Sequence, residues 1–502
     1  MEATLDPLNG RWLLVLATVR RALATRQPIR ASRRIRPTAH FGIIIGTAML
    51  SYANHGKFPP LTQAARPKSR RKKRLCRSND VTAAPVPRLQ WTMPGTRLQM
   101  RRADDQNECR VPARPCASLR SGAERPARRL CASAPRLKAP PMNFASDNTA
   151  PVAPAILDAL AEASRGYARG YGNDEWTKTA ERRFCDIFER EVAAFLVPTG
   201  TAANALALAQ VSPPWGAILC HDQSHILTDE CGAPEFFGHG VKLVGLSGAG
   251  GKITTDGLHE TLAGYGGHSP HQVIPSALSI SQATEAGTIY RTNEIAALAD
   301  IARQRSLAVH MDGARFANAL VRLNATPAQM TWRSGVDVLS LGATKGGALA
   351  AEAVIFFDPA VAASFGERRK RGGHLLSKHR FVAAQFLAYF TEDRWLALAR
   401  HANGMADKLA QALTATGLPP VWPVEANLLF VVLSRELDAK LRAAGASYYV
   451  RSSDGLDIGA QNVLVRLVTS FATTEEDVER FVKLCESFEE RPAKARPRVA
   501  PI

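Results

Sequence analysis

An apolar run leads into a single lysine among small residues in Asp337-Val338-Leu339-Ser340-Leu341-Gly342-Ala343-Thr344-Lys345-Gly346-Gly347. The apolar part is typical of a buried strand, and a lysine on its own most often points into solvent. A lysine that directly follows a buried strand and is flanked by glycines is instead placed to be partly desolvated. Because desolvation lowers the pKa of an amine, Lys345 is a candidate for forming a Schiff base.

Two further motifs stand at expected strand ends, where open α/β sheets bind ligands. Ala308–Arg315 (AVHMDGAR) is an apolar strand that ends at Asp312, which could bind metal, cap a helix or hold a protonated heterocyclic nitrogen. Pro198–Asn204 (PTGTAAN) follows one expected helix and opens another. Its glycine and the helix N-terminus suit a phosphate, although Thr-Gly-Thr is also an ordinary turn and cap. An anion-binding turn, an acid and a lysine in this order form a specific combination.

The segment from Met142 alternates strands with helices over roughly 200 residues, which predicts an α/β domain with a mostly parallel sheet. The expected helices are Glu175–Leu196 and Asn293–Arg305, and the expected strands are Val241–Leu246, Leu307–Met311, Val336–Leu341 and Ala353–Phe357. After about Arg400 a helix, three strands and a last helix predict a smaller α+β domain. Its strands are Leu428–Leu433, Tyr448–Val450 and Val463–Val468, and its last helix is Glu475–Phe488.

Charge and proline content divide the chain at Met142. The sequence has a formal net charge of +19, from 64 Lys and Arg against 45 Asp and Glu. Residues 1–141 hold 29 of those basic and 7 of those acidic residues, and 15 of the 31 prolines, so residues 142–502 are close to neutral. We divide the chain into a basic extension (1–141), a large domain that includes the N-terminal segment (142–400), a small domain (401–488) and a tail (489–502).

The basic extension has no sustained helical or strand period. It can bury too little apolar surface to offset the entropy of ordering, so we expect it to be disordered. Its charge suggests a nucleic-acid-binding arm, although prolines interrupt the arginines, and its Arg, Ser and Ala content suits a transit peptide, although it is long for one. We favour a third interpretation, upstream sequence read through, because Met142 opens a segment that looks like a complete enzyme.

Cysteine spacing and hydropathy limit the class of protein. None of the eight cysteines forms a C-x-x-C pair, so zinc and thioredoxin-type chemistry have little support, and we expect no metal. Scattered thiols favour a reducing compartment. The longest apolar run, Phe41–Leu50, is about half of a membrane span and too far from the N-terminus for a secretory signal. We expect a cytoplasmic protein, with no nucleic acid or membrane as a partner of residues 142–502.

The three motifs in this order match fold type I pyridoxal 5′-phosphate enzymes. From about Met142 to Phe488 the chain resembles the low-specificity L-threonine aldolases, within the aromatic amino acid β-eliminating lyase and threonine aldolase superfamily. Besides the Thr-Gly-Thr turn, the matching stretches are Ser146–Thr149 (SDNT), Tyr171–Asp174 (YGND), Ser224–Ile226 (SHI), His310–Arg315 (HMDGAR), Lys345–Gly347 (KGG) and Arg466–Thr469 (RLVT). The extension has no counterpart.

The resemblance implies how the cofactor would be held. Lys345 would bind it as a Schiff base, Asp312 would pair with the protonated pyridine nitrogen, and Arg315 would contact the ring oxygen. His225 would stack over the ring face. The phosphate would lie at Gly200 and Thr201.

The resemblance also implies the reaction, which is cleavage of L-threonine, L-allo-threonine or β-phenylserine to glycine and an aldehyde. Ser146 and Arg466 would bind the substrate carboxylate, the arginine as a bidentate clamp. Many relatives have a histidine near the β-hydroxyl, in the stretch aligned with Ser281–Thr288. Here that position is Glu285, so the candidates for the base are Glu285 and His225.

Fold type I sites are built from two subunits, so the resemblance implies a homo-oligomer, either a dimer or a tetramer. Lys378 and Arg380 could reach the phosphate of a neighbour. A β-eliminating lyase or an aminotransferase needs the same lysine, acid and phosphate turn, and these activities stay open as alternatives.

Overall fold

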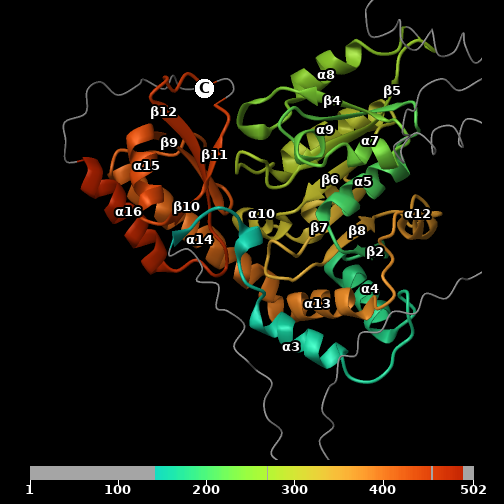
Figure 1. Ribbon diagram of the computed structural model, residues 1–502. Coiled ribbons are helices and arrows are strands. Elements are labelled where there is room, and N and C mark those ends of the chain that lie inside the picture. Colours follow the sequence, from blue (N-terminus) through green and yellow to red (C-terminus); the bar gives the residue numbers. More distant parts are fainter. Residues whose placement is uncertain (1–141, 268, 454–455, 490–502) are drawn as a thin grey trace, which may run out of the picture. The chain divides into compact units, whose positions relative to one another are not determined.

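The structure is a computed structural model that describes residues 142–267, 269–453 and 456–489. The expectations for residues 1–141, and for the tail beyond residue 489, lie outside the described residues. A seven-stranded sheet forms the centre of the larger domain (Figure 1). Its strands are β2 (Ala193–Val197), β3 (Gly216–His221), β4 (Lys242–Leu246), β5 (Ile274–Ser281), β6 (Ala308–Gly313), β7 (Val338–Gly342) and β8 (Glu352–Phe356).

The strand order is β2-β8-β7-β6-β5-β3-β4. β8 is antiparallel to both of its neighbours, and the other pairs in this sheet are parallel, so the predicted mostly parallel sheet is confirmed. The helices of eight or more residues that pack on it are α4 (Glu175–Phe188), α5 (Gly200–Val211), α8 (Thr255–Ala263), α9 (Thr292–Gln304), α10 (Phe316–Leu323) and α13 (Arg380–Phe390), with α3 (Pro154–Ala163) against α13. Shorter helices are α6 (His225–Thr228), α7 (Ala233–Phe237), α11 (Pro327–Met330) and α12 (Phe365–Arg371).

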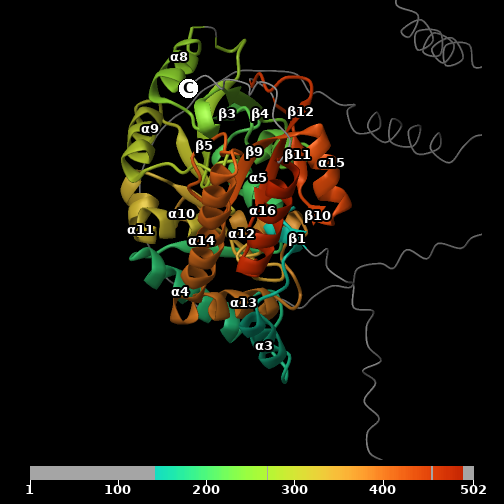
Figure 2. The same cartoon turned by 90° about the vertical axis from the view of Figure 1, so that its left-hand side faces the viewer.

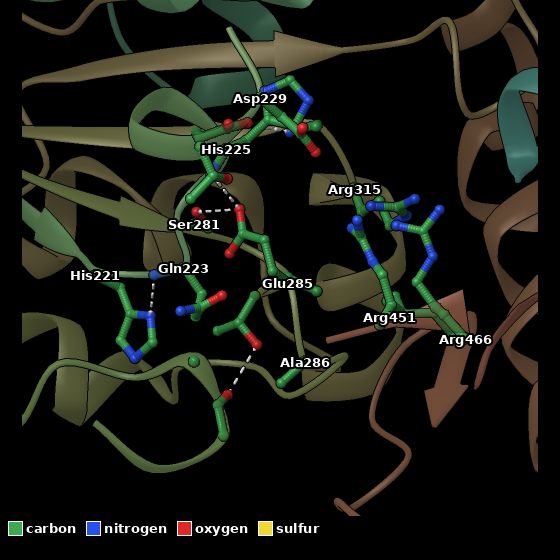
Figure 3. Close-up of a pocket in the computed structure, with 18 of the residues that line it drawn as sticks. His221, Gln223, His225, Asp229, Ser281, Glu285, Ala286, Arg315, Arg451 and Arg466 are labelled. Carbon is green, nitrogen blue, oxygen red and sulfur yellow. Dashed lines mark hydrogen bonds between the residues drawn. The ribbon is translucent and has the colours of Figure 1, made fainter. Parts of the chain in front are cut away.

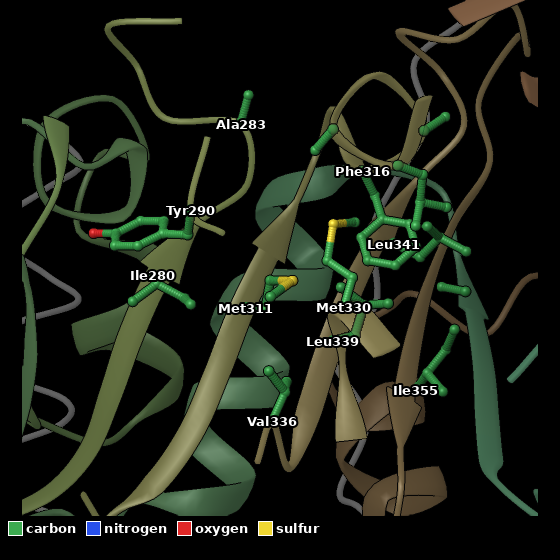
Figure 4. Packing of buried hydrophobic residues seen from close by; sticks show 14 of the residues in the cluster. Ile280, Ala283, Tyr290, Met311, Phe316, Met330, Val336, Leu339, Leu341 and Ile355 are labelled. Atoms are coloured by element: carbon green, nitrogen blue, oxygen red, sulfur yellow. The ribbon is translucent and has the colours of Figure 1, made fainter. Parts of the chain in front are cut away.

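Successive residues of the central strands pack into different layers. Leu339 lies in the core shared with α4, α9, α10 and α13, whereas Val338 lies in the core shared with α5 and α12. Figure 4 shows the first of these cores, with Met311, Leu339 and Ile355 on adjacent strands. Burial on both faces explains why β6 and β7 are mostly apolar and show no regular alternation of apolar and polar residues. It also leaves the strand ends as the place where polar side chains gather.

The predicted helix Glu175–Leu196 is wrong in its last third. α4 ends at Phe188, and Glu189 adopts a left-handed conformation with φ of 57°. The chain then enters β2, in which Phe195 pairs with Val354 of β8. The apolar residues have helical spacing up to Phe188 and strand alternation a few residues later, with no clear break between them. The sequence pattern was therefore assigned to one long helix, and the strand was missed. The Thr-Gly-Thr turn therefore follows a strand and not a helix.

The other predicted elements are present, with ends that differ by one or two residues. β3 and β5 are absent from the predicted strands. β5 ends in Ser-Ile-Ser, and β3 contains only three strongly apolar residues, so neither stands out as a strand in the sequence. Within residues 142–267, 269–453 and 456–489, a search for membrane-spanning helices finds none with the required length and hydropathy.

The smaller α+β domain is also present. Its antiparallel sheet has the order β11-β12-β9, made by β9 (Leu428–Ser434), β11 (Tyr449–Arg451) and β12 (Asn462–Val468). Its helices are α14 (Arg394–Ala415), α15 (Arg435–Ala443) and α16 (Glu475–Glu489), seen beside the sheet in Figure 2. α14 contacts both α10 and α16 and runs through residue 400, so the division at that residue stays a prediction.

The first described residues lie with this smaller domain, although we assigned them to the large one. β1 (Met142–Asn143) pairs with β10 (Ala446–Ser447). The ring of Phe144 packs edge-on against Phe481 of α16, with the centroids 5.2 Å apart. Met142 and Phe144 are both buried, which ties the segment to the small-domain core.

Candidate active site

The carboxyl ends of the parallel strands and one face of the small-domain sheet line a cavity of about 1200 Å³. Most of the predicted site residues line this cavity: Ser146, Gly200, Thr201, His225, Glu285, Asp312, Arg315, Lys345 and Arg466. Lys378 does not line it, and lies exposed before α13. The remaining cavity residues include Asn204, Glu230, Tyr449 and Arg451, to which no role was assigned from the sequence.

Lys345 lies in a tight turn between β7 and β8. The turn is closed by a hydrogen bond from Gly346 N to Ala343 O of 3.0 Å, and a side chain at Gly346 would overlap the Tyr389 hydroxyl. Burial and then the charge of Arg315 lower the pKa of Lys345. A lowered pKa leaves more of the amine neutral and nucleophilic at neutral pH, as Schiff-base formation requires.

Asp312, at the end of β6, is held by two donors. Its Oδ2 accepts a hydrogen bond of 2.8 Å from Asn204 Nδ2, and its Oδ1 accepts one of 3.0 Å from Ala314 N. The carboxylate is therefore fixed at the same sheet edge as Lys345. Such a fixed negative charge suits a protonated ring nitrogen.

The Thr-Gly-Thr turn opens α5. Thr199 is the N-cap, and its hydroxyl accepts a hydrogen bond of 3.2 Å from Ala202 N. A Cβ atom added at Gly200 would meet nothing within 4 Å, so the first helical turn borders open space in the cavity. Free N–H groups and the positive end of a long helix suit a phosphate here.

Arg315 forms a bidentate ion pair with Asp147. Nε and Nη2 of Arg315 lie 2.8 and 3.0 Å from the two carboxylate oxygens of Asp147. Asn427 Nδ2 donates a further hydrogen bond of 3.1 Å to Oδ2 of the same carboxylate. Burial alone would raise the pKa of Asp147, but the charges of Arg315 and Lys345 outweigh it and lower that pKa. Asp147 was not predicted as a site residue, although it lies within the matching SDNT stretch.

Arg466 lies in the middle of the sheet face that borders the cavity. In the antiparallel register Tyr449 is opposite Arg466, and Arg451 is opposite Leu464. The Arg466 guanidinium stacks over the Tyr449 ring at 5.4 Å, and Nη2 donates to Ala145 O at 3.3 Å. Burial, then the charges of Arg315 and Arg451, lower the pKa of Arg466 to about 10. Three cationic groups converge here, which suits an anionic substrate group.

Glu285 lies across the cavity from these arginines (Figure 3). Its Oε1 accepts hydrogen bonds from His225 N at 2.9 Å and Ser281 Oγ at 3.0 Å, whereas its Oε2 is buried without a hydrogen-bond partner. Burial, and then the charge of Asp312, raise the pKa of Glu285. A carboxyl group with a raised pKa and one free oxygen can take up a proton at a higher pH than an ordinary carboxyl group.

The residues present fit pyridoxal 5′-phosphate. The cavity offers one partly desolvated lysine, one fixed acid and one exposed helix N-terminus at neighbouring strand ends. Among the described residues there is no group of His, Cys, Asp and Glu side chains that could hold a metal ion.

This sheet, with its lysine and acid at adjacent strand ends, defines a fold type I pyridoxal-phosphate enzyme. The beta-eliminating lyase family matches residues 143–436, and by this match the chain belongs to that family, among its low-specificity L-threonine aldolases. The low-specificity L-threonine aldolase of Pseudomonas aeruginosa is 41% identical over 62% of this chain and 90% of its own length. The enzyme of the same name from Pseudomonas sp. is 39% identical over the same shares. The structure of Leishmania major threonine aldolase superposes with a TM-score of 0.65 and 30% identity, over 69% of this chain and 99% of that one.

Proposed function

We propose that the chain cleaves L-threonine, L-allo-threonine and related β-hydroxy amino acids such as β-phenylserine to glycine and an aldehyde. The observation that carries the proposal is the division of one cavity into two sides. Arg315, Arg451 and Arg466 lie on one side, and the unpartnered Oε2 of Glu285 lies on the other, with Lys345 also in the lining. An amino acid carboxylate and a β-hydroxyl need these two environments at once.

The arginine side binds and orients the substrate. Arg466 would take the carboxylate as a bidentate clamp, with Ser146 as a further donor. A fixed carboxylate limits rotation about the bond from nitrogen to Cα, and so decides which bond of Cα is labile. The pair with Asp147 keeps Arg315 in place beside this clamp.

The acidic side removes the proton of the β-hydroxyl. Glu285 Oε2 and the His225 ring lie on that side and can accept it, and the Cα–Cβ bond breaks as the proton leaves. When bound, pyridoxal phosphate draws off the electron pair that stays at Cα. Asp312 would support this by pairing with the protonated ring nitrogen.

Incubation of the purified protein with L-threonine and pyridoxal phosphate tests the proposal. We expect equal amounts of acetaldehyde and glycine, and benzaldehyde from β-phenylserine. Formation of ammonia and a keto acid would instead identify a β-eliminating lyase. Transfer of the amino group to an added keto acid would identify an aminotransferase.

We further propose a cytoplasmic homo-oligomer with shared sites. Lys378 is exposed and outside the cavity of its own chain, so any role in phosphate binding requires a neighbouring subunit. The cysteines in the described ranges are free, which agrees with a reducing compartment. Light scattering after gel filtration gives the oligomer size, and Lys378→Ala should weaken cofactor binding if the site is shared.

A further inference from the structure

Four polar side chains form a continuous hydrogen-bonded chain along the cavity. His225 Nδ1 lies 2.8 Å from Glu230 Oε1, which lies 2.8 Å from Asn204 Nδ2. The same Asn204 nitrogen lies 2.8 Å from Asp312 Oδ2. These hydrogen bonds therefore join His225, on the acidic side of the cavity, to Asp312 at the end of β6.

With both carboxyl groups ionised, the amide of Asn204 can have only one orientation in this row of hydrogen bonds. Its NH₂ group has two hydrogens, and two carboxylate oxygens lie within bonding distance of its nitrogen. The reversed amide would place its oxygen against both carboxylates, with no hydrogen between them. Glu230 Oε1 and Asp312 Oδ2 are thus both acceptors, and Asn204 holds the two acids apart.

The proton on His225 follows from the same geometry. Glu230 Oε1 accepts from Asn204, so Nδ1 of His225 is the donor in the contact between His225 and Glu230. In the neutral ring the lone pair then belongs to Nε2. The Glu230 side chain is fully buried, whereas the His225 side chain is 39% exposed and lines the cavity.

We propose that Glu230, held by Asn204, is a positioning residue that keeps the His225 proton on Nδ1, so that Nε2 is the ring atom that exchanges a proton with the substrate. The proposal rests on the aldol cleavage proposed above. It also assigns Glu230 and Asn204 to the site, neither of which contacts the β-hydroxyl in this scheme. The effect on the substrate passes through His225.

The charges around His225 set the direction of the test. The hydrogen bond to Glu230 raises the pKa of His225, burial lowers it, Asp312 raises it and Lys345 lowers it. Glu285 also faces this residue, at its backbone N–H. Removing the charge of Glu230 should therefore lower the pKa of His225, and any increase of activity that depends on neutral His225 should move to lower pH.

Two variants of the full chain separate the charge of Glu230 from its hydrogen bond. In Glu230→Gln the amide oxygen can still accept from Asn204 and His225, so the proton should stay on Nδ1 while the pKa of His225 falls. In Glu230→Ala the acceptor is lost, and a neutral imidazole without it should move its proton to Nε2. Glu260→Gln removes an exposed charge on α8 and serves as the control.

Nitrogen NMR of histidine-labelled protein reads the tautomer and pKa of His225, with His225→Gln to assign the signal. We expect a lower pKa of His225 in Glu230→Gln, a proton on Nε2 in Glu230→Ala, and neither change in Glu260→Gln. The pH profile of kcat/KM in Glu230→Gln should move in the same direction as the pKa of His225. Unchanged His225 signals in both Glu230 variants would overturn the proposal. Since NMR does not require turnover, altered signals in a protein that cannot cleave threonine would support the positioning by Glu230 and overturn the aldol reaction.

Discussion

Asp147 and Arg315 form a buried bidentate ion pair, with Nε to Oδ2 at 2.8 Å and Nη2 to Oδ1 at 3.0 Å. The pair joins the segment that leads into the large domain to an arginine three residues after the acid Asp312. Removing one partner of a buried ion pair leaves the other charge without compensation. The pair is therefore a structural requirement of the site as well as a part of its electrostatics.

We expect Asp147→Ala to lower the free energy of unfolding by about 3 kcal/mol, the usual cost of breaking a buried pair. It should also raise KM, because Arg315 loses its anchor. Urea denaturation and steady-state kinetics measure the two effects. Asp158→Ala, on the exposed face of α3, is the matched control. Equal unfolding midpoints for the two variants would contradict the role of the ion pair.

Lys345→Ala should abolish the visible absorbance of the lysine-bound cofactor and nearly all turnover. The reason is that Lys345 is the lysine placed in the cavity with a lowered pKa. Lys242→Ala, at an exposed position of β4, should keep both properties. Borohydride reduction followed by peptide mapping identifies the modified lysine directly, and modification of another lysine would overturn the site assignment.

A chain that begins at Met142 should fold, assemble and turn over substrate as the full chain does. Charge and proline content both change at this residue, and Met142 itself is buried in the small-domain core. The measurements are the unfolding midpoint, the oligomer size and kcat per bound cofactor. Loss of cofactor binding on truncation would show that residues 1–141 are part of the enzyme.

The lysine, the acid and the Thr-Gly-Thr turn were predictable because each lies in a local pattern. The lysine and the acid end apolar strands, and the turn places a glycine at the start of an apolar helix. The structure places all three at one cavity. The ion pair of Asp147 was not predictable in this way, since its partner is 168 residues away and neither residue interrupts a local pattern. The same holds for Asn204 and Glu230, whose roles come from contacts across the fold. β2 was missed because it follows α4 after only four residues, and the two elements have similar apolar content.

Glu352 predicts a pH dependence of stability. Burial raises its pKa to about 7 from an ordinary value of 4.5. The folded protein therefore keeps a proton that the unfolded chain releases, and the associated stability, present below about pH 4.5, is lost as the pH rises through about 7. The full shift corresponds to about 3 kcal/mol.

Glu352→Gln should remove this loss, because a glutamine stays neutral at every pH. With saturating cofactor in both proteins, the melting temperature of the variant should fall less than that of the parent between about pH 5 and pH 8. Identical falls in the two proteins would show that Glu352 is not the group responsible.

The last prediction concerns Glu285, which beside His225 Nε2 is a candidate acceptor of the β-hydroxyl proton. Its Oε1 is engaged by His225 N and Ser281 Oγ, so Oε2 is the atom left to bind a proton. Glu285→Gln keeps the size of the side chain and one acceptor oxygen but cannot take up the proton. We expect aldol cleavage to fall by roughly 10²-fold or more, the usual scale of general acid–base catalysis.

The same substitution should leave cofactor absorbance and the spectral response to glycine intact, because Lys345 and Arg466 are unchanged. It should also alter the acid limb of the pH profile, since the raised pKa of Glu285 places loss of its basic form at higher pH than for an ordinary carboxyl. Glu260→Gln controls for loss of a charge elsewhere. Cleavage of threonine and β-phenylserine by Glu285→Gln at the parent rate would make Glu285 a structural residue, and would leave His225 Nε2 as the proton acceptor on that side of the cavity.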